Sequence, residues 1–324
     1  MRLVGVYGPG MPTTLTTIPA FVPNPSAPGG IELAEVPRPT ARDDQALVAV
    51  EAYSVNRGEI FLLENPRPDW RPGQDVAGRV VEAAADGTGP PAGARVVGHA
   101  WEGGWAPLVP VATESLVELP DEVSAVTAAT LPLAGLTGIR LLRAAAPLAG
   151  SRVLLTGASG GVGHLVVELA AAQGALITAV SASPERGERL LALGAADVVH
   201  HVEDAEGPFD LAFESVGGQS LEAALARMGE GGTVIWFGRA SGEPAKLDFS
   251  IPANVTIHHF IYWRQGASDS ADLETLVRLV AGGHIHPEIG LQADWHETPD
   301  ALAALRDRRV RGNAVLTIEG NRDV

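Results

Sequence analysis

The chain has 324 residues, of which 46% are hydrophobic and 19% are charged, as is typical of a globular protein with room for two domains. Its net charge of −16 opposes binding to nucleic acid or to an anionic membrane surface. Because cysteine is absent, disulfides and thiolate-ligated zinc sites are excluded. No charge-free run of about 18 apolar residues occurs and no signal peptide is recognised, so we expect a cytoplasmic protein without a transmembrane helix.

The first part of the chain, up to about residue 118, predicts β-rich structure with many breaks. Strands are expected at 31–36 and 46–52, and several shorter ones follow. Residues 8–30 are rich in proline, glycine and threonine and predict a long loop or insertion. Short strands that meet at glycine and proline corners favour a small barrel.

Beyond residue 119 the pattern changes to alternating strands and helices. Strands are expected at 152–156, 175–180, 197–200, 209–213 and 233–237, and helices at 161–173, 184–193 and 218–228. This alternation predicts a doubly wound parallel sheet, with a further strand at 256–261 on its edge. Two amphipathic helices, at 269–282 and 299–308, and a strand at 312–318 close the chain.

The clearest functional motif is a run of glycines between a buried strand and a helix, at Thr156–His164. Gly157, Gly160 and Gly163 are spaced by three, which differs from the strict G-x-G-x-x-G pattern. Such a turn presents bare backbone N–H groups at a helix start, and these bind phosphate. The motif therefore predicts a dinucleotide site, and the alternative is a tight turn of an ordinary α/β domain.

The end of the next strand indicates which dinucleotide is bound. An NAD site usually has a carboxylate about 20 residues beyond the glycines. This chain has Ser181, Ser183 and Arg186 there instead. Hydroxyl and guanidinium groups bind a 2′-phosphate, which a carboxylate would repel, so we predict NADPH as the cofactor. The alternative for Arg186 is a solvated helix residue, as expected for Arg189.

Segments spread over nearly the whole chain resemble the medium-chain dehydrogenase/reductase superfamily. They are Gln74–Gly78, Pro132–Gly138, Gly157–Gly163, Leu193–Ala195, Glu214–Gly218, Gly231–Val234 and Gly312–Leu316. Because the chain has no cysteine, it is most similar to the zinc-free quinone oxidoreductase branch. The resemblance implies an α/β fold with a GroES-like β-barrel catalytic domain over residues 1–118, completed by 265–324. It further implies a Rossmann NADPH-binding domain over 119–264 and a homodimer formed through 256–261.

The resemblance also implies where the cofactor lies. The residues are Thr137, Phe237, Gly238 and Arg239 beside the nicotinamide, Val216 by the ribose, Ser159, Gly160, Gly161 and Val162 on the pyrophosphate, and Ser181, Ser183 and Arg186 at the 2′-phosphate. Asn313 stands where relatives often have lysine and would reach the cofactor phosphates by a hydrogen bond. All of them lie at the carboxyl ends of parallel strands, where ligands bind in such sheets.

The resemblance also places Tyr53 and Asn56 opposite the nicotinamide, as catalytic candidates. We favour Asn56 as a positioning residue and Tyr53, less strongly, as a donor to a developing enolate. The alternatives are a cap of the following turn for Asn56 and an aromatic at the edge of the core for Tyr53. Four further aromatic residues, Trp70, Trp101, Tyr262 and Trp263, could wall a flat pocket, although most aromatic residues belong to the core.

Without a metal, the substrate must already be electrophilic. We therefore expect an NADPH-dependent, zinc-free oxidoreductase that reduces quinones or α,β-unsaturated carbonyl compounds by direct hydride transfer, with the proton taken from solvent. One alternative is an enoyl-thioester reductase or a biosynthetic tailoring reductase, and another is an NADPH-binding sensor or scaffold without turnover. The expected partners are a small-molecule substrate and a second copy of the chain, with neither nucleic acid nor membrane.

Overall fold

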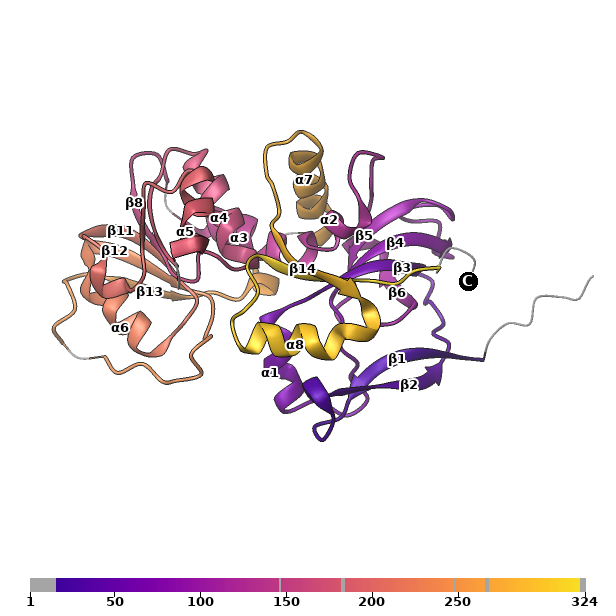
Figure 1. The fold of residues 1–324 in the computed structure, drawn as a ribbon. Coiled ribbons are helices and arrows are strands. Elements are labelled where there is room, and N and C mark those ends of the chain that lie inside the picture. Colours follow the sequence, from indigo (N-terminus) through magenta and orange to yellow (C-terminus); the bar gives the residue numbers. More distant parts are fainter. Residues whose placement is uncertain (1–15, 146, 182–183, 248, 266–267, 321–324) are drawn as a thin grey trace, which may run out of the picture.

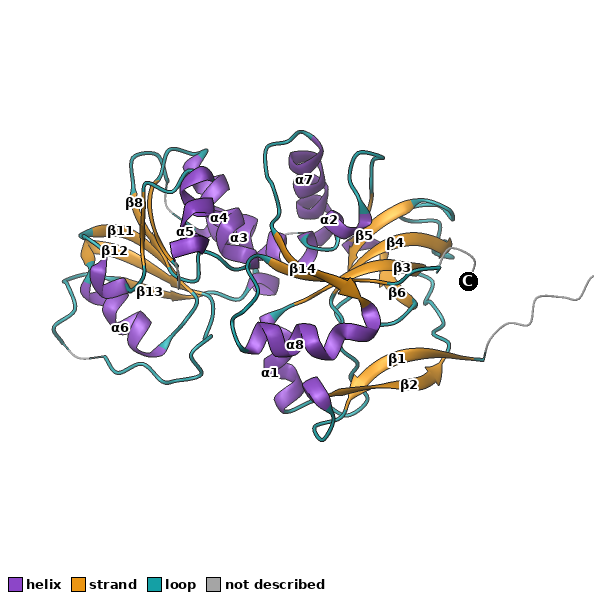
Figure 2. Ribbon diagram, in the orientation of Figure 1, coloured by secondary structure: helices purple, strands orange, loops and turns teal. Residues whose placement is uncertain are grey.

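The computed structural model describes residues 16–145, 147–181, 184–247, 249–265 and 268–320. Its strands form a parallel sheet of six strands, a mainly antiparallel sheet of seven, and a two-stranded ribbon (Figure 1). The two larger sheets lie in separate lobes, with helices packed around and between them (Figure 2). Within the described ranges, no helix is both long and apolar enough to cross a bilayer.

The six-stranded sheet confirms the predicted doubly wound fold. Its strands are β8 (Arg152–Leu155), β9 (Leu176–Val180), β10 (Asp197–Val199), β11 (Phe209–Glu214), β12 (Met228–Trp236) and β13 (Thr256–His259). All pairs are parallel, in the order β10-β9-β8-β11-β12-β13. The order reverses between β8 and β11, and this reversal opens a crevice at the carboxyl ends of the strands.

Helices cover both faces of this sheet. They are α3 (Leu136–Ala144), α4 (Gly161–Ala171), α5 (Pro184–Ala192) and α6 (Gly218–Ala226), with α6 on the face opposite α4 (Figure 1). The central strand β8 is apolar on both faces, because Val153, Leu154 and Leu155 are all fully buried. Short apolar strands alternate with amphipathic or apolar helices along this part of the chain, as the sequence pattern predicts.

The seven-stranded sheet joins both ends of the chain. Its strands are β3 (Gln45–Val55), β4 (Asp75–Glu82), β5 (Arg95–His99), β6 (Leu108–Ala112), β7 (Leu116–Glu118), β14 (Ile289–Asp294) and β15 (Asn313–Thr317). The order is β14-β15-β3-β4-β5-β7, and β6 pairs with the first half of β3. Among the described strands, no pairing of β14 with β7 closes the ring. The domain boundaries expected at 118/119 and 264/265 remain a prediction.

Four more helices pack around this sheet and in the space between the lobes: α1 (Arg57–Glu64), α2 (Ala125–Ala128), α7 (Asp269–Ala281) and α8 (Thr298–Arg306). Helix α1 follows β3 directly and α8 packs against it. Helix α1 begins where β3 ends, and the polar residues at this junction, Asn56 and Arg57, line the cavity described below.

The loop expected over residues 8–30 is wrong at residues 17–23, which form a strand. Strand β1 (Thr17–Pro23) pairs antiparallel with β2 (Ile31–Pro37), and Ile18, Ala20 and Phe21 are buried. Its prolines are tolerated because β2 is its only ladder partner among the described strands, and on the other side of β1 the Phe21 N–H, between Pro19 and Pro23, donates to the Trp105 carbonyl. Residues 1–15 lie outside the described part of the chain.

Candidate functional site

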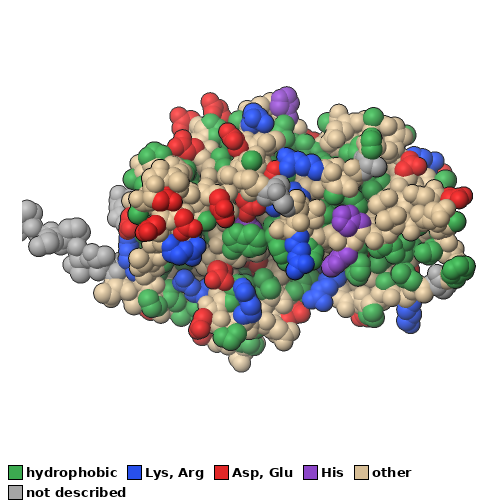
Figure 3. All heavy atoms as spheres, turned by 180° about the vertical axis from the view of Figure 1, so that it is seen from behind, with side chains coloured by type: hydrophobic (Ala, Val, Ile, Leu, Met, Phe, Trp, Pro, Cys, Tyr) green, Lys and Arg blue, Asp and Glu red, His purple; other side chains and the backbone are tan. Residues whose placement is uncertain are grey.

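A cavity of about 1970 Å³ lies between the two lobes. Its wall is formed by the start of α1, the glycine turn before α4, the loops after β11, β12 and β13, and residues around Asn313. Ligand pockets typically measure roughly 300–1,000 Å³, so this cavity has room for a dinucleotide together with a second molecule. On the face shown in Figure 3, Lys and Arg side chains are spread along the middle of the molecule, between areas of acidic side chains.

The glycine turn forms a tight cradle at the floor of the cavity. Gly157 has a φ of +63°, and a Cβ on Gly163 would lie 2.4 Å from the Gly157 carbonyl oxygen. Helix α4 begins at Gly161 with Gly160 as its N-cap, and no side chain caps its first N–H groups. Ser159, Gly160, Gly161 and Val162 all line the cavity. The turn can therefore present free donors and the positive end of a helix dipole to a phosphate.

The loop after β11 is held by a buried carboxylate. Glu214 accepts hydrogen bonds from the backbone N–H of Val216 at 3.0 Å and of Gly217 at 2.9 Å. It also accepts from the hydroxyls of Thr156 and Ser220. Burial raises the pKa of Glu214, and these donors counteract that rise. The carboxylate thus fixes the loop that carries Val216 into the cavity wall.

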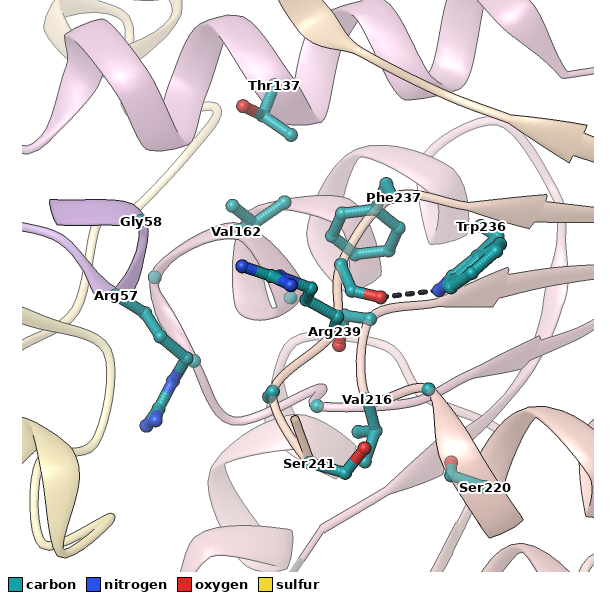
Figure 4. Close-up of a pocket in the computed structure, with 18 of the residues that line it drawn as sticks. Arg57, Gly58, Thr137, Val162, Val216, Ser220, Trp236, Phe237, Arg239 and Ser241 are labelled. Atoms are coloured by element: carbon teal, nitrogen blue, oxygen red, sulfur yellow. Dashed lines mark hydrogen bonds between the residues drawn. The ribbon is translucent and has the colours of Figure 1, made fainter. Parts of the chain in front are cut away.

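The far end of the cavity brings together the residues predicted beside a nicotinamide. Thr137, Val162 and Phe237 lie on one side, next to the loop with Gly238 and Arg239 (Figure 4). The Thr137 hydroxyl donates to the Leu133 carbonyl at 2.7 Å. The indole N–H of Trp236 donates to the Gly238 carbonyl, which fixes the loop.

Asn313 lies against the glycine cradle. Its side-chain amide donates to the Glu288 carbonyl at 3.0 Å, and a Cβ on Gly161 would lie 2.5 Å from its Oδ1. The neighbouring Gly312 N–H donates to the Ser159 carbonyl at 2.8 Å. The start of β15 therefore reaches the glycine turn, and the contact of Asn313 with the cofactor phosphates stays a prediction.

Only part of the predicted 2′-phosphate site lines the cavity. Arg186 does, and its guanidinium donates to the backbone carbonyl of Arg308. Ser181 is buried and is not among the lining residues, while Ser183 lies outside the described residues. Arg308 and Lys246 also line the cavity, and sequence reasoning missed both.

Four arginines line the cavity of a chain with a net charge of −16: Arg57, Arg186, Arg239 and Arg308. Burial, and then the positive charge of Arg308, lower the pKa of Arg57. The Arg239 guanidinium lies 4.8 Å from the centre of the Phe61 ring, so a loop of one lobe contacts α1 of the other. The run Arg308, Arg309, Arg311 in an acidic chain was the available signal for this cluster.

The two catalytic candidates lie in different environments. Asn56 lines the cavity and donates from its side-chain amide to Asp75 Oδ2 at 2.7 Å. Tyr53 is fully buried, stacks on Trp105, and shares a 2.7 Å hydrogen bond with the Thr298 hydroxyl. It is not among the residues that line the cavity, so its location favours the alternative interpretation, an aromatic of the core.

Comparison with known proteins identifies the family. The zinc-binding dehydrogenase family profile matches residues 161–282, and the alcohol dehydrogenase GroES-like domain matches 42–121. The human quinone oxidoreductase is 30% identical over 223 residues, which cover 63% of this chain and 68% of that protein. The chain belongs to the quinone oxidoreductase-like branch of the medium-chain dehydrogenase/reductase superfamily.

Other relatives differ in how much of their length is matched. A quinone oxidoreductase homolog of the chloroplast envelope of Arabidopsis thaliana is 35% identical over 60% of this chain and 63% of its own length. The polyketide synthase GfsB of Streptomyces halstedii is 29% identical over 85% of this chain. That match covers only 5% of GfsB, so this chain is similar to a small part of it.

Solved structures confirm the two-domain fold. Mycobacterial Rv1454c, complexed with NADPH, superposes with a TM-score of 0.84 at 22% identity, over 93% of this chain and 100% of that one. Escherichia coli quinone oxidoreductase, also complexed with NADPH, gives 0.83 at 20% identity, over 93% and 99%.

In this quinone oxidoreductase-like chain, aromatic residues form the cavity wall on the side of β13. Trp101, Tyr262 and Trp263 line the cavity, whereas Trp70 is buried in the core of the seven-stranded lobe. The rings of Trp101 and Tyr262 are stacked at 15°, with centroids 6.3 Å apart. Within the described residues, no three His, Asp or Glu side chains are grouped so that they could hold a metal ion.

Proposed function

We propose that this chain is an NADPH-dependent, zinc-independent oxidoreductase that reduces quinones or α,β-unsaturated carbonyl compounds by direct hydride transfer. The observation that carries the proposal is one cavity with a glycine cradle at one end and an aromatic wall at the other. Family membership supports redox chemistry, and the absence of cysteine argues against a thiolate-ligated zinc.

The residues at the cradle fit a phosphorylated dinucleotide. The pyrophosphate would be held by the N–H groups of Gly161 and Val162, with Asn313 beside them, and the 2′-phosphate by Arg186 with Arg308 and Lys246 nearby. Positions 181–184, directly after β9, carry no carboxylate that would repel a 2′-phosphate, so we infer a preference for NADPH over NADH. When bound, the nicotinamide supplies the hydride.

On the substrate side, the chain's own residues orient the acceptor and exclude water. Trp101 and Trp263 offer flat apolar surfaces that suit a planar conjugated acceptor. The Asn56 amide is fixed by Asp75, which also accepts from the Leu133 N–H at 2.8 Å. A preorganised amide of this kind can position a substrate carbonyl at no cost in reorganisation.

An enoyl-thioester reductase is the second candidate, favoured by one observation. The match to GfsB extends over 85% of this chain, more than the matches to the human and Arabidopsis relatives. A thioester substrate would carry a long polar arm, and the cavity is large enough to admit one. The same residues would hold the cofactor in both cases.

We also propose a homodimer formed through β13. This strand is at the edge of the parallel sheet and pairs only with β12 among the described strands. Ile257 on it is 37% exposed, and a free edge with an exposed apolar residue is suited to pairing with a second copy.

The deciding experiment is a scan of NADPH oxidation against quinones, enones and enoyl thioesters, with a chelator present throughout. Turnover of quinones or simple enones supports the first candidate, and turnover confined to thioesters supports the second. NADPH uptake without oxidation by any acceptor would show a binding protein. Activity that appears only when zinc is added would refute zinc independence.

A further inference from the structure

Three hydrogen-bonded side chains lead to the aromatic end of the cavity. The Nδ1 atom of His99 lies 3.0 Å from Asp269 Oδ2, and its Nε2 atom lies 3.0 Å from the Tyr262 hydroxyl. His99 is fully buried, whereas Tyr262 lines the cavity and keeps 7% of its surface exposed. Because the three residues come from β5, α7 and the turn after β13, their hydrogen bonds link both lobes at the site.

Asp269 is held as a carboxylate. Arg140 donates to its Oδ1 at 2.8 Å, and the Ser115 hydroxyl donates to its Oδ2 at 3.1 Å. Burial acts to raise the pKa of Asp269, but the hydrogen bonds from His99 and Arg140 outweigh it and bring the pKa to about 2. An ionised Asp269 accepts the Nδ1–H of His99, and this orients Nε2 toward Tyr262.

The Tyr262 ring is fixed from its other side by Trp101. The Trp101 ring stacks on Tyr262 and lies 4.3 Å, centre to centre, from His99. Trp101 adopts a φ of +65°, a left-handed conformation that a bulky residue rarely takes. Such outliers concentrate at functional sites, where surrounding contacts maintain them. These contacts hold the Tyr262 ring in place. Tyr262 lies in the cavity wall after β13, near the carboxyl ends of β11 to β13, where the nicotinamide is expected.

We propose that Tyr262 is the proton donor to the reduced substrate, that His99 reloads Tyr262, and that Asp269 positions His99. This inference rests on the proposed function, and it replaces the expectation that solvent protonates the substrate directly. The Tyr53 hydroxyl fails the same test, because it is bonded to Thr298 and Tyr53 is not among the residues that line the cavity.

The proton balance is as follows. Once the β-carbon of an enone has gained hydride, the electron pair of the double bond moves onto the enolate. The O–H bond of Tyr262 breaks as a C–H bond forms at the α-carbon, or an O–H bond in the case of a quinone. The Nε2–H bond of protonated His99 breaks as the Tyr262 hydroxyl reforms. Neutral His99 keeps its Nδ1–H on Asp269, and because His99 is fully buried, its Nε2–H is restored through the Tyr262 hydroxyl, which passes its proton to Nε2 as it takes up another from solvent in the cavity.

The direction of the hydrogen bond depends on the charge of His99. When His99 is protonated, Nε2–H donates to the Tyr262 oxygen, and the hydroxyl proton is not held by His99. When His99 is neutral, the hydroxyl donates to Nε2 and is no longer available. Burial, and then Asp75 and Asp269, raise the pKa of Tyr262, so the hydroxyl stays protonated at neutral pH. The titratable and charged groups that surround this pair are Asp269, Arg140, Asp75 and Glu59.

The test compares wild type with Tyr262→Phe in D₂O, using a 2-substituted cyclic enone that gains a stereocentre at its α-carbon. Wild type is expected to place deuterium on one face. Tyr262→Phe is expected to react about 100-fold more slowly and to give both faces. Tyr53→Phe removes an equally buried hydroxyl and is expected to leave facial selectivity unchanged.

Two measurements need no turnover. Unliganded wild type and Tyr262→Phe should both show a low-field proton resonance from the Nδ1–H of His99, and Asp269→Asn should lose it. NADPH binding by Tyr262→Phe should stay within about twofold of wild type, since the hydroxyl is not part of the cofactor site. A variant that keeps both the rate and the facial selectivity would overturn the inference while leaving the proposed function intact. A wild type inactive with every acceptor would overturn both.

Discussion

The α-carbon of Gly163 faces the carbonyl oxygen of Gly157 so closely that a Cβ there would lie 2.4 Å from that oxygen. The Cα of Ala158 would be only 2.6 Å away, so the obstacle is backbone and cannot rotate aside. Helix α4 can therefore pack onto the end of β8 only because position 163 has no side chain. This contact sets the direction in which the first N–H groups of α4 point.

We predict that Gly163→Ala lowers the free energy of unfolding by about 1–3 kcal/mol, the usual cost of overpacking. It should also weaken NADPH binding at least about tenfold, because the helix start is displaced from the phosphate. Chemical denaturation and fluorescence titration measure the two effects. Gly138→Ala is the matched control, since its Cβ would meet Val166 at an ordinary 3.7 Å. If Gly163→Ala bound NADPH as tightly as wild type, this would contradict the proposal that the glycine turn holds a phosphate of the cofactor.

Arg186 should decide the choice between the two nicotinamide dinucleotides. A charge-assisted hydrogen bond contributes about 1.5–3 kcal/mol, so Arg186→Ala should weaken NADPH binding roughly 10- to 100-fold and leave NADH binding nearly unchanged. Arg189→Ala, on the same helix but away from the cavity lining, should alter neither. Equal losses for both dinucleotides would mean that Arg186 acts through its bond to the Arg308 carbonyl rather than on a 2′-phosphate.

The sequence predicted those parts of the site that depend on local pattern. The glycine turn was predicted from its place between a short apolar strand and a helix, whereas Val216 and Phe237 were placed by the family resemblance. All three follow parallel strands, whose carboxyl ends share one edge of the sheet. Strand β1 was missed because its prolines suggest a loop, whereas a strand with one ladder partner tolerates them. Local pattern therefore identifies the elements but does not reveal which edges remain unpaired.

Tertiary pairing decides the rest of the site. Tyr53 and Asn56 are three residues apart, yet the pairing of Tyr53 with Leu316 and Val76 puts its ring in the core, while Asn56 reaches the cavity. Arg308 meets Arg186 across 122 positions of sequence, and no local pattern links them. The same holds for His99 and Tyr262, which are 163 positions apart.

If the chain forms the proposed dimer, a substitution at the interface should lower the mass of the particle in solution. Ile257→Lys places a charge on the free edge of β13 and should weaken association at least about tenfold, since burying an unpaired charge is costly. Sedimentation at micromolar concentration should show a dimer for wild type and mostly monomer for the variant. Leu176→Lys, on β9 between two other strands, should leave the mass unchanged. A wild type that stays monomeric at every concentration would refute the dimer.

Glu59 should make stability fall as pH rises toward 8. It is fully buried beside Asp75, and burial, then the Asp75 charge, raise its pKa from 4.5 to about 8, although the backbone N–H groups of Asn56, Gly73 and Gln74 donate to it. Between these two values the folded protein holds a proton that the unfolded chain has lost. The stability that this proton contributes is complete below pH 4.5 and is lost as pH rises through about 8.

Glu59→Gln removes this titration from the folded state. Between pH 4.5 and about pH 8, the free energy of unfolding of wild type, relative to the variant, should therefore fall by up to about 1 kcal/mol per pH unit. Chemical denaturation at intervals between pH 5 and pH 8 measures the difference. Glu64→Gln, at the exposed end of the same helix, controls for the loss of one carboxylate. A difference that stays constant with pH would mean that three backbone donors suffice to keep Glu59 ionised in the folded protein.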